Sequence, residues 1–308
     1  MSLSVQEMIA QSKGKKNKKF IEKIIPWILL LIASVSVLTT IGIVLTLIVE
    51  TFTFFTRVSV FDFAFGTTWL PFSNKQELYG ILPLIVGTLK VTLIAVIVAV
   101  PIGISAAIYL SEYASETVRR IVKPVLEVLA GIPTIVYGFF ALTFVTPLLQ
   151  SFFPEIKIFN AISPGIVVGI MIIPMIASLS EDAMSAVPRS IRDGALAMGS
   201  TKFEVAWKII VPAALSGIIA SVVLAVSRAI GETMIVSLAG GSTPKLDGDF
   251  AGSIQTMTAY IVQVSKGDAG YGTTIYYSIY AVGFTLFLFT MLMNILAQYV
   301  SKRFREEY

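Results

Sequence analysis

The chain contains no cysteine and no histidine, and only 14% of its 308 residues are charged. The missing cysteines exclude disulfides, thiolate nucleophiles and thiolate metal sites, and the missing histidines remove the commonest proton shuttle and metal ligand. A soluble domain needs about a quarter of its residues charged to cover its surface, whereas 56% of this chain is hydrophobic. The composition therefore predicts an integral membrane protein in which metal and nucleophile chemistry are disfavoured.

Six apolar runs are long enough to cross a hydrocarbon core of about 30 Å at about 1.5 Å per residue. The predicted spans are 24–49, 84–110, 122–149, 162–179, 213–238 and 274–300. We expect an all-α polytopic membrane protein with a basic segment at 1–23, a six-helix domain at 24–300 and a tail at 301–308. The first span is too long for the apolar region of a signal peptide and no A-x-A site follows it, so we interpret it as a retained anchor.

Basic residues are distributed unevenly among the connections between these spans. Sixteen of the 23 lie in the N-terminal segment, the second and fourth connections and the tail, whereas the alternate connections hold five. Cytoplasmic loops of membrane proteins carry the excess of lysine and arginine, so both termini and the fourth connection are predicted to be cytoplasmic. The asymmetry also explains the net charge of +4 without a basic, aromatic-lined groove for nucleic acid. We therefore expect membrane lipid, and no nucleic acid, as a partner.

Residues 190–212, in the fourth connection, begin with signals for a short polar helix. Ser190 is expected to cap this helix with Asp193 as the reciprocal acid, and Gly199 to end it in a left-handed conformation. Three apolar residues recur on one face of the expected helix: Ile191, Ala195 and Met198.

A second helix is expected directly after the glycine. Thr201 and Glu204 repeat the capping pattern, and Pro212 is expected to stop this helix. The result is a helix, a glycine hinge and a helix. Such a hairpin either lies on the membrane surface without a partner or is contacted by another protein from the cytoplasm.

Seven residues of this stretch follow the spacing D-G-A-x3-G-x9-I-x-V-P: Asp193, Gly194, Ala195, Gly199, Ile209, Val211 and Pro212. The pattern resembles the EAA loop of ABC importer permeases, E-A-A-x3-G-x9-I-x-L-P. Three of the seven positions depart from it. Asp193 keeps the carboxylate, Gly194 weakens the helix by up to about 1 kcal/mol, and Val211 is a mild change. The glycine hinge and the terminating proline are both kept.

Four further segments are similar to phosphate importer permeases of the PstC type: WLPFSNKQELYGILPLIVGTL from Trp69, AAIYLSEYA from Ala106, KPVLEVLAGIPTIVYG from Lys123 and SRAIGETM from Ser227. The resemblance implies a permease of the type I ABC importer fold in a prokaryotic cell membrane. It also implies a second related permease, two copies of a cytoplasmic ATP-binding subunit and an extracytoplasmic phosphate-binding protein as partners. Residues 190–212 would be the coupling helix that seats in a groove of the ATP-binding subunit.

The chain has no G-x4-G-K-[ST] phosphate loop. The nearest string, GSTK from Gly199, lacks the second glycine and stands in the coupling segment. We therefore expect a transport subunit and not an enzyme. ATP and magnesium are expected on the partner subunits, with no cofactor bound by this chain.

Four charged residues fall inside the predicted spans: Lys90, Glu127, Arg228 and Glu232. A charge at the bilayer centre costs about 2.5 to 3.5 kcal/mol, so each needs a partner or a wet cavity. Arg228 and Glu232 are spaced i, i+4 and can pair on one helix face. They form either a structural ion pair or an exchangeable one, in which the guanidinium trades the carboxylate for phosphate. The resemblance places an arginine and a glutamate implicated in transport at these positions of an R-A-x-G-E motif.

Lys90 and Arg228 fall at similar depths when about 1.5 Å per residue is counted from the ends of their spans. They are expected to contribute to one electropositive level. Alternatively, Lys90 extends its ammonium to the outer interface. Glu127 is expected at a different level, where it steadies a kink at Gly131 and Pro133.

Aromatic residues before the second span and the polar stretch 240–250 mark either the membrane interface or a docking surface for a phosphate-binding protein. The expected mechanism is alternating access in a complex of two permeases, with no covalent step on this chain. Rival functions stay open at this point. They are an importer for sulfate or molybdate, a secondary anion carrier driven by an ion gradient, and a membrane scaffold that transports nothing.

Overall fold

The computed structural model describes residues 16–73 and 76–303, and these are mostly helical. Contacts divide the chain into two units, residues 1–50 and 51–308. Helix α2 (Lys16–Phe55) runs without a break through the first predicted span, and its part from Lys23 to Phe55 is long and apolar enough to cross a membrane. The basic residues before residue 16 and the tail from residue 304 lie outside the described part of the chain.

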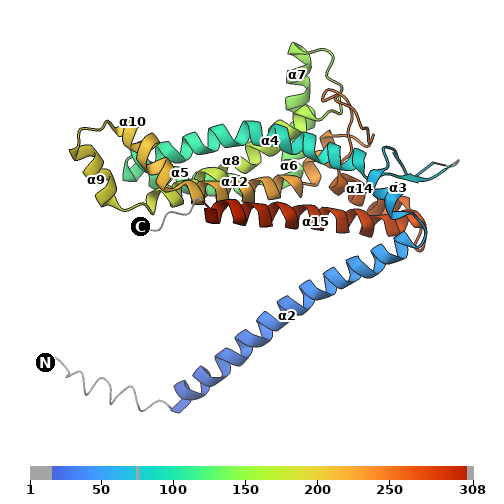
Figure 1. Cartoon of the computed structure of the whole chain (residues 1–308), viewed down its shortest axis with the longest axis horizontal. Coiled ribbons are helices and arrows are strands. Elements are labelled where there is room, and N and C mark those ends of the chain that lie inside the picture. Colours follow the sequence, from blue (N-terminus) through green and yellow to red (C-terminus); the bar gives the residue numbers. More distant parts are fainter. Residues whose placement is uncertain (1–15, 74–75, 304–308) are drawn as a thin grey trace. The chain divides into compact units, whose positions relative to one another are not determined.

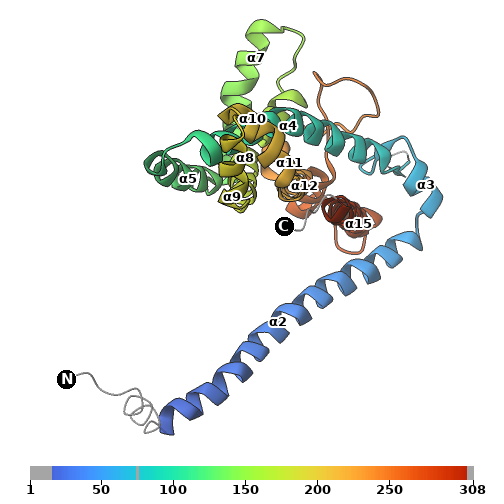
Figure 2. The ribbon, with the colours of Figure 1, turned by 60° about the vertical axis from the view of Figure 1, so that its left-hand side comes forward.

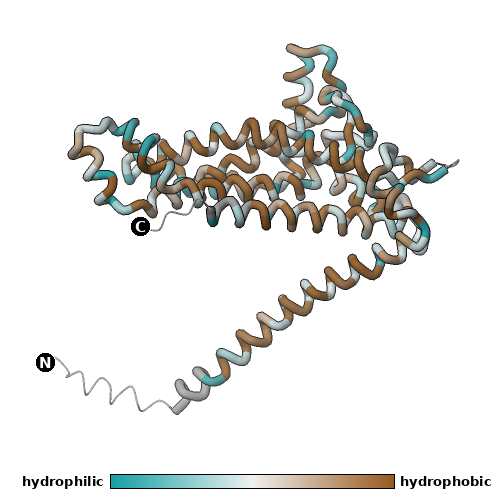
Figure 3. The backbone as a smooth tube through the Cα atoms, in the orientation of Figure 1, coloured by the Kyte–Doolittle hydropathy of each residue, from teal (hydrophilic) through white to brown (hydrophobic). Residues whose placement is uncertain are grey.

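The second unit is a bundle of apolar helices (Figure 1). Helices α4 (Leu82–Ile108), α8 (Ile162–Ser185) and α15 (Thr274–Arg303) contain the predicted second, fourth and sixth spans. Hydrophobic residues run along these helices, whereas hydrophilic residues gather near α9 (Arg189–Ala197) and α10 (Lys202–Val205) (Figure 3). The bundle therefore has an apolar middle and a polar end, as a membrane protein requires.

The third span begins later than predicted. Helix α5 (Glu116–Ala130), which was expected to start this span, is amphipathic and buries none of its residues within the described structure. The apolar crossing helix, Thr134–Phe152, follows the break at Gly131 and Pro133. It consists of three pieces: α6 (Thr134–Phe140), η2 (Ala141–Val145) and α7 (Thr146–Phe152). The break forms because Pro133 has no backbone N–H to continue the helical ladder.

The fifth span is interrupted near its far end. Helix α12 (Leu215–Ile230) ends at Gly231, and a separate short helix, α13 (Met234–Ala239), follows. The segment Lys202–Ala213 that precedes α12 is bent from it by 72°. The predicted span 213–238 is therefore two helices in the structure.

Pro212 does not stop the helix before it, contrary to the prediction. It lies in the first turn of the short helix α11 (Val211–Ala213), where the missing N–H of a proline is tolerated. The chain instead changes direction at Ala214, between α11 and α12.

The two ends of the second unit differ (Figure 1 and Figure 2). One end carries α9 and α10, together with two π-helical turns: η1 (Tyr109–Tyr113) and η3 (Ala206–Ile210). The other end carries two short helices, a π-helical turn and two strands: α3 (Val60–Phe65), α14 (Met257–Gln263), η4 (Val264–Asp268), β1 (Trp69–Leu70) and β2 (Leu78–Tyr79). The strands pair antiparallel with Trp69 opposite Tyr79.

Helices α4 and α8 make the most extensive helix contact in the described structure. Glycines permit this approach, since a Cβ built on Gly165 would lie 2.7 Å from the Cβ of Ile94. A Cβ on Gly103 would likewise lie 2.8 Å from the Cβ of Ile176. Small residues at helix interfaces are a common device in membranes, where dispersion contacts hold helices together.

Gly165→Val is expected to lower the free energy of unfolding by about 1 to 3 kcal/mol, because the added side chain forces α4 and α8 apart. Thermal unfolding of the purified protein in detergent measures the loss. Gly194→Val is the matched control, since a Cβ at Gly194 meets no atom within 4 Å. Equal losses in the two variants would contradict this packing.

Candidate functional site

The segment expected to bind another protein is a helical hairpin at the polar end. Helix α9 ends before Gly199, whose φ of +89° confirms the predicted left-handed hinge. Helix α10 follows with the predicted capping box, in which Thr201 Oγ1 accepts from the Glu204 N–H and the Glu204 carboxylate accepts from the Thr201 N–H. The predicted cap at Ser190 is wrong. Pro188 precedes α9 and Ser190 is its second residue, because proline fixes the backbone at the helix start.

One face of the hairpin packs on the bundle and the other is open. Ile191, Ala195 and Ile209 contact a buried apolar cluster that includes Met184 and Ile210. The outer face carries residues that the sequence pattern singled out: Asp193, Gly194, Met198 and Pro212. Met198 is 87% exposed, so its predicted place on the packed face is wrong. The exposed face is thus available to another protein.

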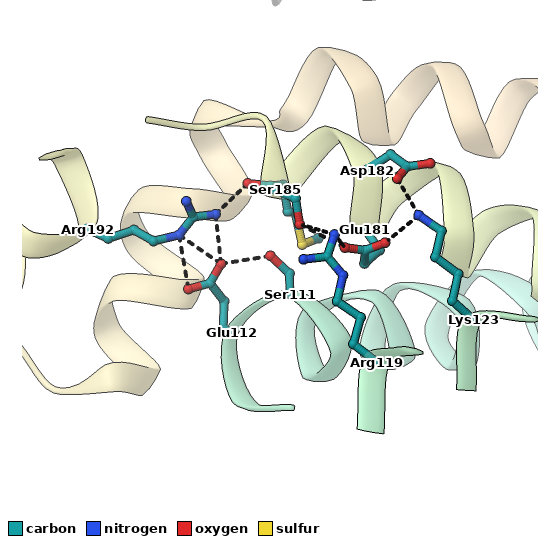
Figure 4. A network of polar contacts seen from close by, with 9 residues as sticks. Ser111, Glu112, Arg119, Lys123, Glu181, Asp182, Ser185 and Arg192 are labelled. Carbon is teal, nitrogen blue, oxygen red and sulfur yellow. Dashed lines mark hydrogen bonds and ion pairs between the residues drawn. The ribbon is translucent and has the colours of Figure 1, made fainter. Parts of the chain in front are cut away.

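Arg192 fixes α9 to the rest of the bundle (Figure 4). Its Nε and Nη2 donate to the carboxylate of Glu112 in η1 at 3.2 Å and 3.1 Å. Its Nη1 and Nη2 also donate to the carbonyls of Val187 and Met184, each at 2.6 Å. Both side chains of the ion pair are largely buried, with 17% and 10% exposed. A planar guanidinium fork of this kind sets both distance and orientation.

A second ion-pair network joins α5 to the end of α8 (Figure 4). Glu181 is fully buried, and its carboxylate contacts the guanidinium of Arg119 and the Nζ of Lys123, the latter at 2.9 Å. Ser185 Oγ donates to the same carboxylate at 2.7 Å. The exposed carboxylate of Asp182 accepts a second bond from Lys123 at 2.5 Å. Hydrogen bonds from three groups compensate the burial of this charge.

The sequence did not predict this network. Glu181 lies just beyond the predicted end of the fourth span, and its two basic partners are 58 or more residues away. The available signal was the pair of acids at the end of one span and the basic cluster at the start of α5.

A cavity of about 310 Å³ lies between the two ion-paired sites. Its lining includes four basic and two acidic residues: Arg119, Arg189, Arg192, Lys202, Glu112 and Asp193. The hairpin is therefore held to the bundle on one side by apolar packing and on the other by charges around a cavity.

The predicted pair Arg228–Glu232 is not formed. Gly231 ends α12 between the two residues, so they do not share a helix face. The Glu232 carboxylate instead accepts from the backbone N–H groups of Met234 and Ile235 at 3.0 Å and 3.2 Å and caps α13. Arg228 is exposed and has no acidic partner within 4.0 Å among the described residues.

Lys90 is buried, with 6% of its side chain exposed, and is fixed to the polar loop at 240–250. Its Nζ donates to the carboxylate of Asp247 at 3.0 Å and to the carbonyl of Asp249 at 2.7 Å, and lies 5.3 Å from the ring centre of Phe250. The Lys90 ammonium holds the pKa of the Asp247 carboxyl below its usual range. No contact in the described structure joins Lys90 to Arg228, so their common level stays a prediction.

Glu127 lies on the exposed surface of α5, outside the crossing helix of the third span. The break after α5 is bridged by another residue, because the hydroxyl of Tyr137 donates to the carbonyl of Leu129 at 3.0 Å. Among the described residues, Glu127 makes no hydrogen bond that would give the kink its predicted support.

The aromatic run before the second span is divided between core and surface. Phe54, Phe63 and Trp69 are buried in one apolar cluster with Tyr79 and Tyr260, so these aromatic residues pack the core. Three phenylalanines are more than 70% exposed: Phe52, Phe61 and Phe65. A groove of about 840 Å³ beside them is lined by both apolar and polar side chains. The exposed phenylalanines are compatible both with a place at the membrane interface and with a docking surface for a phosphate-binding protein.

Comparison with known families places this geometry among transport proteins. Residues 99–306 match the family described as "Binding-protein-dependent transport system inner membrane component". The chain is 32% identical over 249 residues to the probable ABC transporter permease protein YqgH of Bacillus subtilis, covering 80% of this chain and 79% of that protein. It is 31% identical over 257 residues to the phosphate transport system permease protein PstC of Xylella fastidiosa, covering 77% of each. For PstC of Haemophilus influenzae, identity is 29% over 310 residues, with 94% and 96% covered.

Two solved ABC importers share the fold. A chain of a bacterial alginate ABC transporter, in complex with an alginate-bound periplasmic protein, aligns with a TM-score of 0.63 at 15% identity, covering 94% of this chain and 98% of that one. A chain of the MetNI methionine ABC transporter aligns with a TM-score of 0.54 at 16% identity, covering 74% and 95%. These alignments confirm the predicted ABC importer permease fold.

Proposed function

Since the chain belongs to the family of binding-protein-dependent transport system inner membrane components, we propose that it is a permease subunit of an ATP-driven importer of inorganic phosphate. The observation that supports the substrate is the identity of about 30% to PstC phosphate permeases over 77% to 94% of this chain. The family makes the chain a transport subunit and not an enzyme.

The proposed assembly has three kinds of partner. A second related permease completes the anion path, and an extracytoplasmic phosphate-binding protein delivers the substrate. Of two ATP-binding subunits, one contacts the exposed face of α9 around Asp193 and Gly194 from the cytoplasm, where both termini of this chain also lie. ATP and magnesium bind those subunits, which agrees with the absence of a phosphate loop in this sequence.

Motion passes from α9 into the membrane helices through Arg192. The guanidinium holds the carboxylate of Glu112 in η1, which continues α4, and the carbonyl of Met184 in α8. It also donates to the carbonyl of Val187 in the connection between α8 and α9. A displacement of α9 by an ATP-binding subunit therefore pulls on α4 and α8 together. These two helices pack most extensively on one another and move as one body.

In the proposed anion path, two cations of this chain contact the substrate. Arg228 has a guanidinium without an acidic partner in the described structure, so that it can bind two phosphate oxygens without first breaking an ion pair. Lys90 adds a second positive charge from α4. Glu232 contributes indirectly, because it caps α13 directly after the arginine-bearing helix. Glu127, which was also predicted to lie on the path, is on the exposed surface of α5, and its part in transport stays a prediction.

Uptake of labelled phosphate into vesicles that contain the full transporter tests the proposal. We expect uptake that requires ATP and the binding protein and that excess sulfate does not compete away. Uptake driven by an ion gradient would identify a secondary carrier. Uptake of sulfate or molybdate in place of phosphate would assign another oxyanion, and no uptake of any oxyanion would contradict transport.

Arg228→Gln is expected to lower phosphate uptake by about tenfold, because a charge-assisted contact to the anion contributes about 1.5 kcal/mol or more. Initial uptake rates in the same vesicles measure this. Arg120→Gln, which removes an exposed arginine from α5, is the control for loss of positive charge. Full activity of Arg228→Gln in an assembled complex would remove Arg228 from the path.

A further inference from the structure

The polar loop between α13 and α14 is closed at its base and fixed to the residue before α8. The carbonyl of Gly240 accepts from the Ile254 N–H at 2.9 Å, and the carbonyl of Phe250 accepts from the Ala161 N–H at 3.0 Å. Between these points, Lys90 is the one side chain from outside the loop that hydrogen-bonds to residues 242–249 within the described structure. The loop middle therefore depends on a single ammonium group.

The ammonium and its carboxylate differ in exposure. Lys90 is 6% exposed, whereas the Asp247 side chain is 41% exposed and reaches solvent. A buried ammonium needs a counter-charge, since its charge is otherwise desolvated without compensation. Asp247 cannot leave without cost unless another anion takes its place.

The same ammonium has capacity for an additional acceptor. A lysine ammonium has three N–H donors, and the structure assigns two of them, to the Asp247 carboxylate and the Asp249 carbonyl. Lys245, on the same loop, adds positive potential near Asp247. A tetrahedral oxyanion that approaches from solvent can bind the third donor and then replace the carboxylate.

We propose that Lys90 is an anion subsite that Asp247 occupies until an oxyanion displaces it, so that binding of the anion releases the loop. This inference rests on the proposed oxyanion transport and adds a residue, Asp247, to it. Because the Lys90 charge is balanced before and after exchange, the loop opens when substrate is present and stays closed in its absence. Chloride, a monatomic ion with one charge and no oxygen atoms to bridge the site, is expected to exchange poorly.

Electron paramagnetic resonance of a spin label on the loop tests the exchange. The natural chain has no cysteine, so Leu246→Cys in the full transporter carries a single label on this subunit. We expect inorganic phosphate to raise the mobile fraction of the label at least about twofold, the signature of a population shift. Potassium chloride at the same ionic strength is expected to leave it unchanged.

Two variants of neighbouring aspartates sharpen the test. Asp247→Asn removes the counter-charge, so the label is expected to be mobile without phosphate and to respond no further. Asp249→Asn is the matched control, because its side chain contacts the Ala251 N–H and only its backbone carbonyl contacts Lys90. It is expected to respond as the parent does. Lys90→Gln is expected to behave as Asp247→Asn.

The outcomes separate the exchange from the transport function. A label that ignores every oxyanion in the parent protein, in vesicles that still import phosphate, would overturn the exchange and leave the proposed function intact. An Asp247→Asn variant that responds as the parent does would also overturn it. A label that responds to sulfate but not to phosphate, in vesicles that import sulfate, would keep the exchange and overturn the phosphate assignment.

Discussion

Arg192→Ala is expected to lower ATP-driven phosphate uptake by about 30-fold or more, while the transporter continues to hydrolyse ATP. The substitution removes a largely buried forked ion pair with Glu112 and hydrogen bonds to the carbonyls of Met184 in α8 and Val187 just after it. Interactions of this kind are worth about 2 to 3 kcal/mol together, and about 1.4 kcal/mol corresponds to a factor of ten. Without them α9 can move with the ATP-binding subunit and leave α4 and α8 behind.

The ratio of phosphate imported to ATP hydrolysed measures this uncoupling in reconstituted vesicles. Arg120→Ala is the matched control, because Arg120 is an exposed arginine of α5, outside the hairpin, and makes no ion pair within the described residues. Arg192→Lys is expected to recover only part of the coupling, since an ammonium cannot reproduce the planar fork. A variant Arg192→Ala with an unchanged ratio would show that motion reaches the membrane helices by another route.

Glu181→Ala is expected to have the largest effect on stability, with a loss of about 2 to 3 kcal/mol in the free energy of unfolding. The substitution leaves Arg119 and Lys123 facing each other across the space of a fully buried carboxylate. The expected loss is smaller than the value of about 3 to 5 kcal/mol that is typical of fully buried pairs. The reason is that the two cations are 40% and 25% exposed and stay partly hydrated.

Chemical denaturation of the purified protein in detergent measures the difference. Asp182→Asn is the control, since Asp182 is 54% exposed and shares Lys123 with Glu181. Its removal is expected to cost less than about 1 kcal/mol, as for surface ion pairs in general. Similar losses in the two variants would mean that the buried carboxylate does not hold α5 to α8.

Two features set by local sequence were predicted correctly, although the cap at Ser190 and the helix end at Pro212 were not. The capping box of Thr201 and Glu204 and the left-handed Gly199 depend on neighbours within a few residues, and the structure has both. Long apolar runs likewise gave the spans in α4, α8 and α15, because the thickness of a bilayer fixes the length of a crossing helix.

Breaks inside apolar runs were harder to place. Hydrophobicity continues across Gly131 and Pro133 and across Gly231, whereas the helix does not. Pairing of Arg228 with Glu232 at i, i+4 requires a continuous helix, and the glycine between them was a signal against such a helix. Outside the helix, the Glu232 carboxylate finds backbone N–H groups that need a cap.

Contacts between distant segments could not be predicted from the sequence. Glu181 meets Lys123 across 58 residues and Lys90 meets Asp247 across 157 residues. Each charge was visible in the sequence, but its partner depends on how helices and loops pack, and no local pattern encodes that arrangement. The prediction for Lys90 foresaw a need for compensation and missed the loop that supplies it.

Crosslinking from Met198 tests the central claim most directly, that a hinged hairpin of this subunit receives force from an ATP-binding subunit. Met198 is 87% exposed beside the hinge, and Met198→Cys gives a unique attachment point in a chain without cysteine. A photoactivatable crosslinker on this residue is predicted to capture the ATP-binding subunit in intact membranes, at a yield that changes when ATP is added. Crosslinks to no ATP-binding subunit, or labelling of Met198→Cys only by an impermeant reagent applied outside the cell, would contradict the account.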